Sequence, residues 1–213
     1  MQILPALDIV RRWQCDAVVE SISMAGLPGL PSTSVLLNAE AGLLSAAWDD
    51  FQGQSAWLFF DTTGPAFFHG MSLENTRGDA WCLELERRAR KVCSSDRWGE
   101  VQRMPREATG SMGLLFSLHA ADLHSSWIDL SSMDETMNAV LEMDWPLPVS
   151  NNEEFVSWLA ERHEIGQQAM ILEILEKQSA SAVVQLANEC GCEVVDIKNL
   201  LISIGFDSEV LRR

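Results

Sequence analysis

The sequence predicts an α+β protein, in which a mixed N-terminal part with a small antiparallel sheet is followed by an all-helical C-terminal part. Three observations predict this class. Short apolar runs separated by turn residues fill much of the first 130 residues, helical periodicity dominates after residue 150, and the Pro-containing segment 145–150 separates the two. We therefore divide the chain of 213 residues into a domain at 1–148 and a helical domain or subdomain at 149–213.

The first predicted element is an amphipathic helix over residues 6–24. Val10, Trp13 and Ala17 belong to a set of apolar residues that recur at helical spacing. The segment 25–31 (AGLPGLP) ends this helix, because Gly and Pro do not continue a helix without cost.

Strands are predicted next. The segments 34–37 and 56–60 are apolar, short and bounded by polar or Gly-rich stretches, whereas 43–48 fits either a strand or a helix. We interpret the carboxylates that follow these runs as turn residues that bind their own backbone; they are Asp49, Asp50 and Asp61. Further strands are predicted near residues 67–68, 114–118 and 126–130.

Helices occupy the rest of the chain. The pairs Ser132 with Glu135 and Ser150 with Glu153 both fit the capping box that begins a helix. The predicted helices are 79–92, 132–143, 151–163, 165–176, 180–190 and 194–203.

The charge of the chain is strongly negative and unevenly distributed. There are 31 acidic residues against 15 Lys and Arg, a net charge of −16. Residues 107–165 hold 11 acids and one base, Arg162, whereas residues 77–106 hold 8 bases and 5 acids. Such a chain repels nucleic acid and anionic membranes and attracts basic protein surfaces, while the same charge also favours solubility.

We therefore expect an acidic cytoplasmic protein that binds a basic or amphipathic protein partner, as an adaptor, a secretion chaperone or an immunity protein would. The chain shows neither a secretory signal nor the 18–20 apolar residues that span a bilayer. Neither nucleic acid nor membrane is expected as a partner, and no cofactor. The expected contact residues are acids and Trp residues within the acidic block, residues 107–165. They are Asp129, Asp134, Glu135, Glu142, Asp144, Trp145, Glu153, Glu154 and Trp158.

The basic cluster of the predicted helix 79–92 has two interpretations. It consists of Arg87, Arg88, Arg90 and Lys91. Glutamates at 84 and 86 stand four residues before two of these bases, which favours a self-compensated, solvated helix face. Alternatively, the cluster pairs with the acidic block, either within the fold or across a homodimer.

An enzyme is the second hypothesis, although no catalytic motif supports it. The chain lacks a phosphate-binding loop, a G-x-G-x-x-G fingerprint and a G-x-S-x-G turn, and the start of H-E-x-x-H at His163 lacks its second His. We interpret His163 as an exposed residue at a helix end. The weak catalytic candidates are His119, Asp122 and His124, which stand close together in HAADLH.

The five cysteines form an odd and scattered set that favours neither disulfides nor zinc. We expect reduced and mostly buried thiols, with two of them as secondary catalytic candidates, Cys82 and Cys93. The remaining cysteines are Cys15, Cys190 and Cys192.

The segment 183–201 (VVQLANECGCEVVDIKNLL) resembles a helix-turn-helix. The motif needs a small residue in its first helix, Gly at the turn and apolar residues in its second helix, and the matching positions are Leu186, Ala187, Gly191, Ile197 and Leu200. The resemblance implies a transcription regulator, the third hypothesis. The charge argues against it, because residues 166–213 hold four bases and seven acids, and phosphate contacts need cations.

Overall fold

The structure is a computed structural model. It describes residues 3–25, 31–38, 43–61, 66–72, 113–120, 122, 124–129, 138, 140, 143, 151–192 and 194–206. The predicted helix at 79–92, with its basic cluster, lies outside these residues, as does most of the predicted helix at 132–143.

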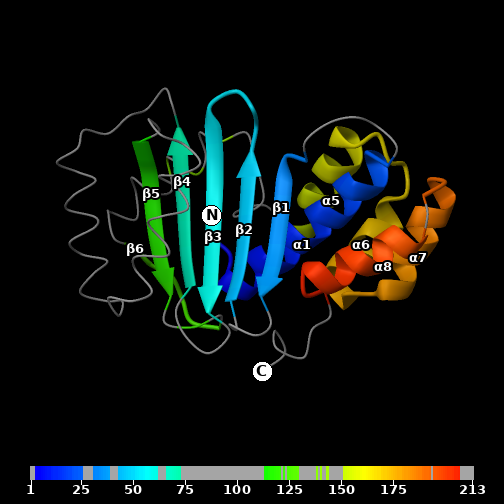
Figure 1. The fold of residues 1–213 in the computed structure, drawn as a ribbon. Helices are drawn as coiled ribbons and strands as arrows, with labels where there is room; N and C mark the ends of the chain where they lie inside the picture. The colour runs from blue at the N-terminus through cyan, green and yellow to red at the C-terminus, as the bar shows by residue number, and fades with distance from the viewer. Residues whose placement is uncertain are drawn as a thin grey trace.

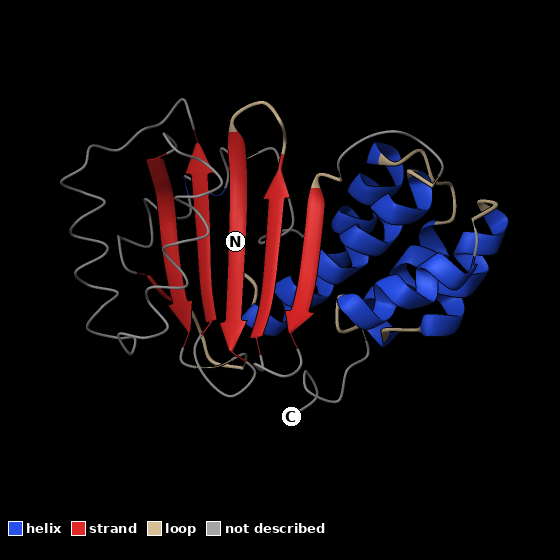
Figure 2. Cartoon of the chain, viewed as in Figure 1, coloured by secondary structure: helices blue, strands red, loops and turns tan. Residues whose placement is uncertain are grey.

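The described residues confirm the α+β class: a long helix and a sheet are followed by a group of helices (Figures 1 and 2). The helices are α1 (Ala6–Ser23), α5 (Asn152–Arg162), α6 (Gln168–Lys177), α7 (Ala180–Glu189) and α8 (Val194–Ser203). The strands are β1 (Thr33–Asn38), β2 (Leu43–Asp49), β3 (Gln54–Asp61), β4 (Ala66–Ser72), β5 (Gly113–Ala120) and β6 (Ile128–Asp129).

The sheet is antiparallel throughout, and its strands follow one another in chain order from β1 to β6. The ambiguous segment 43–48 is strand β2, because it pairs with β1 on one side and with β3 on the other. Asp49 and Asp50 are turn residues as predicted: their carboxylates accept the N–H groups of Phe51 at 2.6 Å and of Gln52 at 2.7 Å. The last strand, β6, is shorter than the predicted 126–130.

Helix α1 connects the sheet to the other helices. Figure 1 shows that it runs from behind the sheet past the edge strand β1, and that α5–α8 lie beside that edge. On the sheet, the Trp13 ring meets Phe68 edge-on at 5.9 Å and donates a hydrogen bond to the Ala47 carbonyl at 3.3 Å. Beyond the sheet, the Gln14 amide donates to the Ile204 carbonyl at 2.8 Å.

The predicted first helix is present as α1, but its polar residues are buried and do not form an exposed polar face. Arg12, Gln14, Asp16 and Glu20 are all at most 4% exposed. The side of α1 that the sheet leaves open is covered by α5–α8, so its polar residues need partners inside the protein.

The starts of α5 and α6 differ from the sequence prediction. The capping box of α5 is formed by Asn151 and Glu154, one residue after the predicted pair Ser150 and Glu153. Helix α6 begins at Gln168 instead of residue 165, because Ile165 is buried in the connecting turn and its N–H bonds the Ala160 carbonyl.

One hydrophobic core extends across the predicted boundary at residue 148. Buried apolar residues of α1, the sheet and α5–α8 belong to the same cluster, for example Val18, Trp48, Phe68, Phe155 and Leu186. The helical C-terminal part therefore packs on α1 through apolar side chains, beside a small number of buried polar contacts.

We predict that Gly205→Ala will lower the free energy of unfolding by about 2–4 kcal/mol, as measured by urea denaturation. Gly205 has φ +66°, and an added Cβ would lie 2.6 Å from Leu37 Cδ2. Gly191→Ala is the matched control: its φ is +76°, but no atom lies within 4 Å of the added Cβ, so about 1 kcal/mol is expected. Equal losses in the two variants would contradict a steric contact between Gly205, in the turn after α8, and Leu37 of β1.

Candidate functional site

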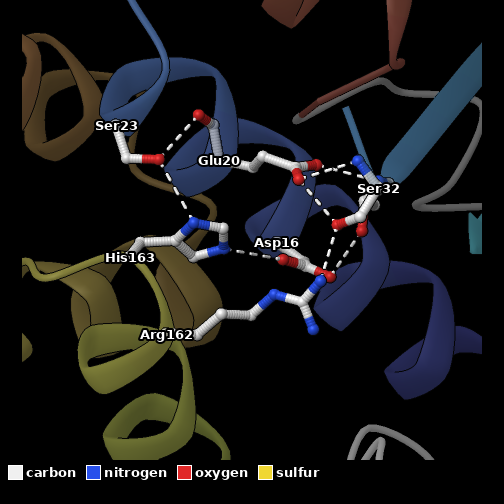
Figure 3. A network of polar contacts seen from close by, with 7 residues as sticks. Asp16, Glu20, Ser23, Ser32, Arg162 and His163 are labelled. Carbon is white, nitrogen blue, oxygen red and sulfur yellow. Dashed lines mark hydrogen bonds and ion pairs between the residues drawn. The ribbon is translucent and has the colours of Figure 1, made fainter. Parts of the chain in front are cut away.

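A buried carboxylate on α1 binds the beginning of the edge strand β1 (Figure 3). Glu20 Oε1 accepts hydrogen bonds from the Ser32 backbone N–H at 2.8 Å and from its hydroxyl at 2.6 Å. Glu20 Oε2 accepts the Thr33 backbone N–H at 2.8 Å. Because an ionised carboxylate accepts strong hydrogen bonds, this contact fixes the end of β1 on the helix.

A second buried carboxylate stands one helical turn earlier and joins β1 to α5. Asp16 Oδ2 accepts the Thr33 hydroxyl at 2.7 Å, and Oδ1 lies 3.5 Å from His163 Nε2. The other imidazole nitrogen, Nδ1, is 3.2 Å from the Ser23 hydroxyl. The side chain of His163 is 7% exposed, so the prediction of an exposed histidine at the helix end is wrong: it ends α5 but turns toward α1.

The residue before His163 completes the contact with β1. The Arg162 guanidinium donates to the Ser32 hydroxyl at 2.8 Å and lies 5.0 Å above the Trp158 ring. Trp158 in turn stacks on Phe155, with ring centroids 6.1 Å apart. The predicted partner-binding Trp158 is thus half-buried, in contact with both Arg162 and Phe155.

The beginning of α5 is held by another residue of α1. Arg12 donates to Asn152 Oδ1 at 2.9 Å and lies 5.0 Å above the Phe155 ring. Burial lowers the pKa of Arg12 to about 10, which leaves the guanidinium charged at neutral pH. Helix α5 is therefore attached to α1 at both of its ends.

This polar network holds elements together and is not arranged for nucleophilic catalysis. Ser23, His163 and Asp16 are the residue types of a Ser-His-Asp relay. However, the Ser23 hydroxyl donates to the Glu20 carbonyl of its own helix at 2.9 Å, and a relay needs open space beside the nucleophile. The imidazole of His163 is nearly covered. Among the described residues, no three His, Cys, Asp or Glu side chains could hold a metal ion together.

The predicted catalytic candidates are not brought together as a site. His119 is buried in β5, whereas Asp122 and His124 are exposed. Asp122 Oδ1 accepts the backbone N–H groups of His124 at 2.9 Å and Ser125 at 2.8 Å. Hydrogen bonds from the Ser125 side chain and the His124 backbone hold the pKa of Asp122 below its usual range. Asp122 thus has the geometry of a turn residue.

A second buried histidine, His69, lies on the neighbouring strand β4, where it pairs with Ser117, while His119 pairs with Phe67. Phe68 and Leu118 are paired across β4 and β5, and Phe68 faces Trp13 of α1. Since side chains alternate along a strand, His69 and His119 both project from the opposite face of the sheet. Burial lowers the pKa of His69 from its ordinary 6.5 to about 4, and it also lowers that of His119. His69 was not among the candidates predicted from the sequence, although it alternates with Phe68 along the predicted strand.

The predicted partner-binding residues fall into two groups. Glu153 and Glu154 are exposed in the first turn of α5, and Glu154 also belongs to the capping box. Asp129 lies in β6. Apart from the half-buried Trp158, the others lie outside the described residues: Asp134, Glu135, Glu142, Asp144 and Trp145.

The described cysteines differ in burial. Cys15 is fully buried, its thiol is 3.9 Å from the Ile171 carbonyl, and burial raises its pKa. Cys192 donates to the Ile22 carbonyl at 3.1 Å. Cys190 is exposed, which departs from the expectation of mostly buried thiols. The secondary candidates Cys82 and Cys93 lie outside the described residues.

The segment that resembles a helix-turn-helix consists of two helices and a turn. Leu186 and Ala187 of α7 and Ile197 of α8 are buried, and Gly191 adopts φ +76° between the helices. From residue 180 to residue 206, Lys198 is the one Lys or Arg in the sequence. A single cation is too few to contact a phosphate backbone, so the charge of this segment does not support DNA binding.

Comparisons with protein-family models, with curated proteins and with solved structures found no match to this chain. No helix in the part of the chain that the structure describes is long and apolar enough to cross a membrane. The function of this chain is therefore inferred from the chemistry of its own residues.

We predict that Glu20→Gln will lower the free energy of unfolding by about 2–4 kcal/mol, because one acceptor oxygen is replaced by an amide that faces donors. Denaturation in urea measures the loss. Glu161→Gln is the matched control on the exposed surface of α5 and should change stability by less than about 0.5 kcal/mol. Similar values for the two variants would show that Glu20 does not hold β1.

We also predict that stability falls as the pH is lowered from about 7.5 to about 5, in part through His69. The folded protein keeps His69 neutral down to its pKa of about 4, whereas the unfolded chain binds a proton near its ordinary 6.5. The unfolded state therefore binds more protons in this window, and His69 alone accounts for a loss of about 2 kcal/mol. Comparing wild type with His69→Asn at both pH values isolates this contribution; an identical pH dependence would refute it.

Proposed function

We propose that this protein is a non-enzymatic interaction protein that binds a partner protein through a basic surface of that partner. An adaptor, a secretion chaperone and an immunity protein all match this description, and a cytoplasmic location suits each of them. The observation that carries the proposal is the exposed acidic surface of α5–α7.

This acidic surface is dense and weakly compensated. Residues 151–192 contain seven Glu, one Arg and one Lys, a net charge of −5 from seven acids and two bases. Glu173 is 44% exposed at its side chain, and the other six acids are exposed. The full set is Glu153, Glu154, Glu161, Glu164, Glu173, Glu176 and Glu189.

Both bases of this segment are engaged within the protein. Arg162 contacts Ser32 and the Trp158 ring, and Lys177 lies 3.8 Å from Glu173 on the next turn of α6. Within residues 151–192, two bases are too few to neutralise seven acids, so this segment presents a net negative charge to an approaching protein. Such a potential mainly raises the association rate and sets specificity.

Charge alone supplies little affinity, which comes mainly from side chains that a partner buries. Among the described residues, three large apolar side chains are exposed: Leu36 at 60%, Phe51 at 61% and Ile202 at 78%. Binding energy is concentrated in side chains that become fully buried at an interface. The three lie on separate elements, in β1, in the turn after β2 and in α8, so the proposal depends on the acids and not on them.

The proposal predicts a stoichiometric protein partner whose association is accelerated by charge. Affinity capture on the tagged full chain from its native lysate, at low and moderate salt, identifies the partner by mass spectrometry. The association rate is then measured by biolayer interferometry. We expect that rate to fall about 10-fold in moderate salt and about 3-fold in the triple variant Glu161→Gln, Glu164→Gln, Glu189→Gln.

Asn188→Ser, an exposed change on α7 that leaves the charge unaltered, is the matched control and should keep the wild-type rate. An association rate that neither salt nor the triple variant changes would overturn the electrostatic basis of the proposal. If no protein is captured at either salt concentration, the interaction function itself is rejected.

A further inference from the structure

A shallow groove runs between α5 and α6 on the acidic surface. It has a volume of about 310 Å³ and is lined by Glu153, Val156, Ser157, Gln168, Ala169 and Leu172. This volume is at the lower end of the range of about 300–1,000 Å³ that is typical of ligand pockets. The groove is therefore large enough for one long side chain and too small for a whole helix.

The lining combines polar and aliphatic side chains. Val156 is 4% exposed and Leu172 is half-buried, so the aliphatic surface that they offer in the groove is small. Glu153, Ser157 and Gln168 supply a carboxylate, a hydroxyl and an amide oxygen, all of which accept hydrogen bonds. No Lys or Arg lines the groove.

An arginine side chain matches this combination better than the other side chains do. Its aliphatic stem covers apolar surface while its charged end reaches polar groups. The planar guanidinium donates two parallel hydrogen bonds to a carboxylate and is weakly hydrated, which lowers the cost of placing it in a groove. The surrounding acids of α5 and α6 attract such a cation.

The walls of the groove are fixed before a partner arrives. Helix α5 is attached to α1 near its beginning through Arg12 and Asn152, and at its end through Asp16 and His163. Asn152 Nδ2 also lies 3.3 Å from Glu176 Oε1 of α6, which links the two walls. A preformed groove loses little conformational entropy on binding.

We propose that the groove between α5 and α6 receives one arginine side chain of the basic partner, with its guanidinium at Glu153. This inference rests on the proposed function and names the place and the residue type by which the partner is recognised.

The test uses the full ¹⁵N-labelled chain and two small probes, Nα-acetyl-arginine N-methylamide and the citrulline counterpart, which has the same shape without the charge. Amide chemical shifts are followed by NMR as each probe is added. We expect saturable shifts at the groove residues with the arginine probe and an affinity about fivefold weaker with the citrulline probe. Equal affinity for both probes, or shifts spread evenly over the acidic surface, would overturn the inference.

Three variants locate the binding. Glu153→Gln should weaken the arginine probe about fivefold, to the level of the citrulline probe, and Ala169→Leu should abolish saturable binding by filling the groove. Glu161→Gln removes the same charge from α5 outside the groove and should keep the affinity within about twofold. Each variant is first checked for a wild-type spectrum away from the substitution. Unaltered affinity in both Glu153→Gln and Ala169→Leu would reject the groove.

The two proposals fail in different ways. If the captured partner binds with a salt-dependent rate but Glu153→Gln and Ala169→Leu leave that rate and its affinity unchanged, the groove is wrong and the interaction function stands. If the arginine probe occupies the groove but no protein partner is captured, the interaction function fails and the groove remains a site for a guanidinium group.

Discussion

The pair of buried carboxylates on α1 is the constraint on which the rest of the structure depends. Asp16 and Glu20 stand one helical turn apart, and both are almost completely covered. A buried charge is tolerated only where hydrogen bonds and opposite partial charges replace water, so the surroundings of these residues are not free to vary. Ser32 and Thr33 provide the donors from β1, and His163 stands beside Asp16 from α5. Sheet and helices thus meet at one polar centre, within a core that is otherwise apolar.

This centre determines how α5 is placed, and with it the acidic surface. The helix could rotate or slide on an apolar contact alone, because apolar packing has little directional preference. Hydrogen bonds of defined length at Asn152 and Arg162, together with the His163–Asp16 contact, remove that freedom at both ends. The outer side of α5 then carries its glutamates in a fixed arrangement. A binding surface on such a rigid element needs less ordering on association than one on a loop.

The sequence predicted the class, the order of the elements and most strands of the fold, because apolar alternation and helical periodicity are local signals. It did not predict that the polar residues of α1 are buried, since that depends on helices more than 120 residues later in the chain, as the Arg12–Asn152 and Gln14–Ile204 bonds illustrate. For the same reason His163 was interpreted as a surface residue. The groove could not be predicted from Glu153 alone, because it exists only where α5 and α6 lie side by side. By contrast, the exposure of Glu153 and Glu154 followed from their position in the first turn of a helix, where acids also stabilise the helix dipole.

The protein uses its charges in two different ways. Inside, Arg12, Asp16 and Glu20 are each bonded to specific partners, and they define how the elements fit. Outside, the glutamates of residues 151–192 outnumber their counter-charges, and the two bases of that segment are engaged within the fold. Uncompensated surface charge repels itself and so weakens the folded state, with no gain in packing. A few surface lysines would neutralise the exposed acids without disturbing the buried polar contacts. The retained excess is therefore not a requirement of folding; it fits the proposed attraction of a basic partner, and the same charge also favours solubility.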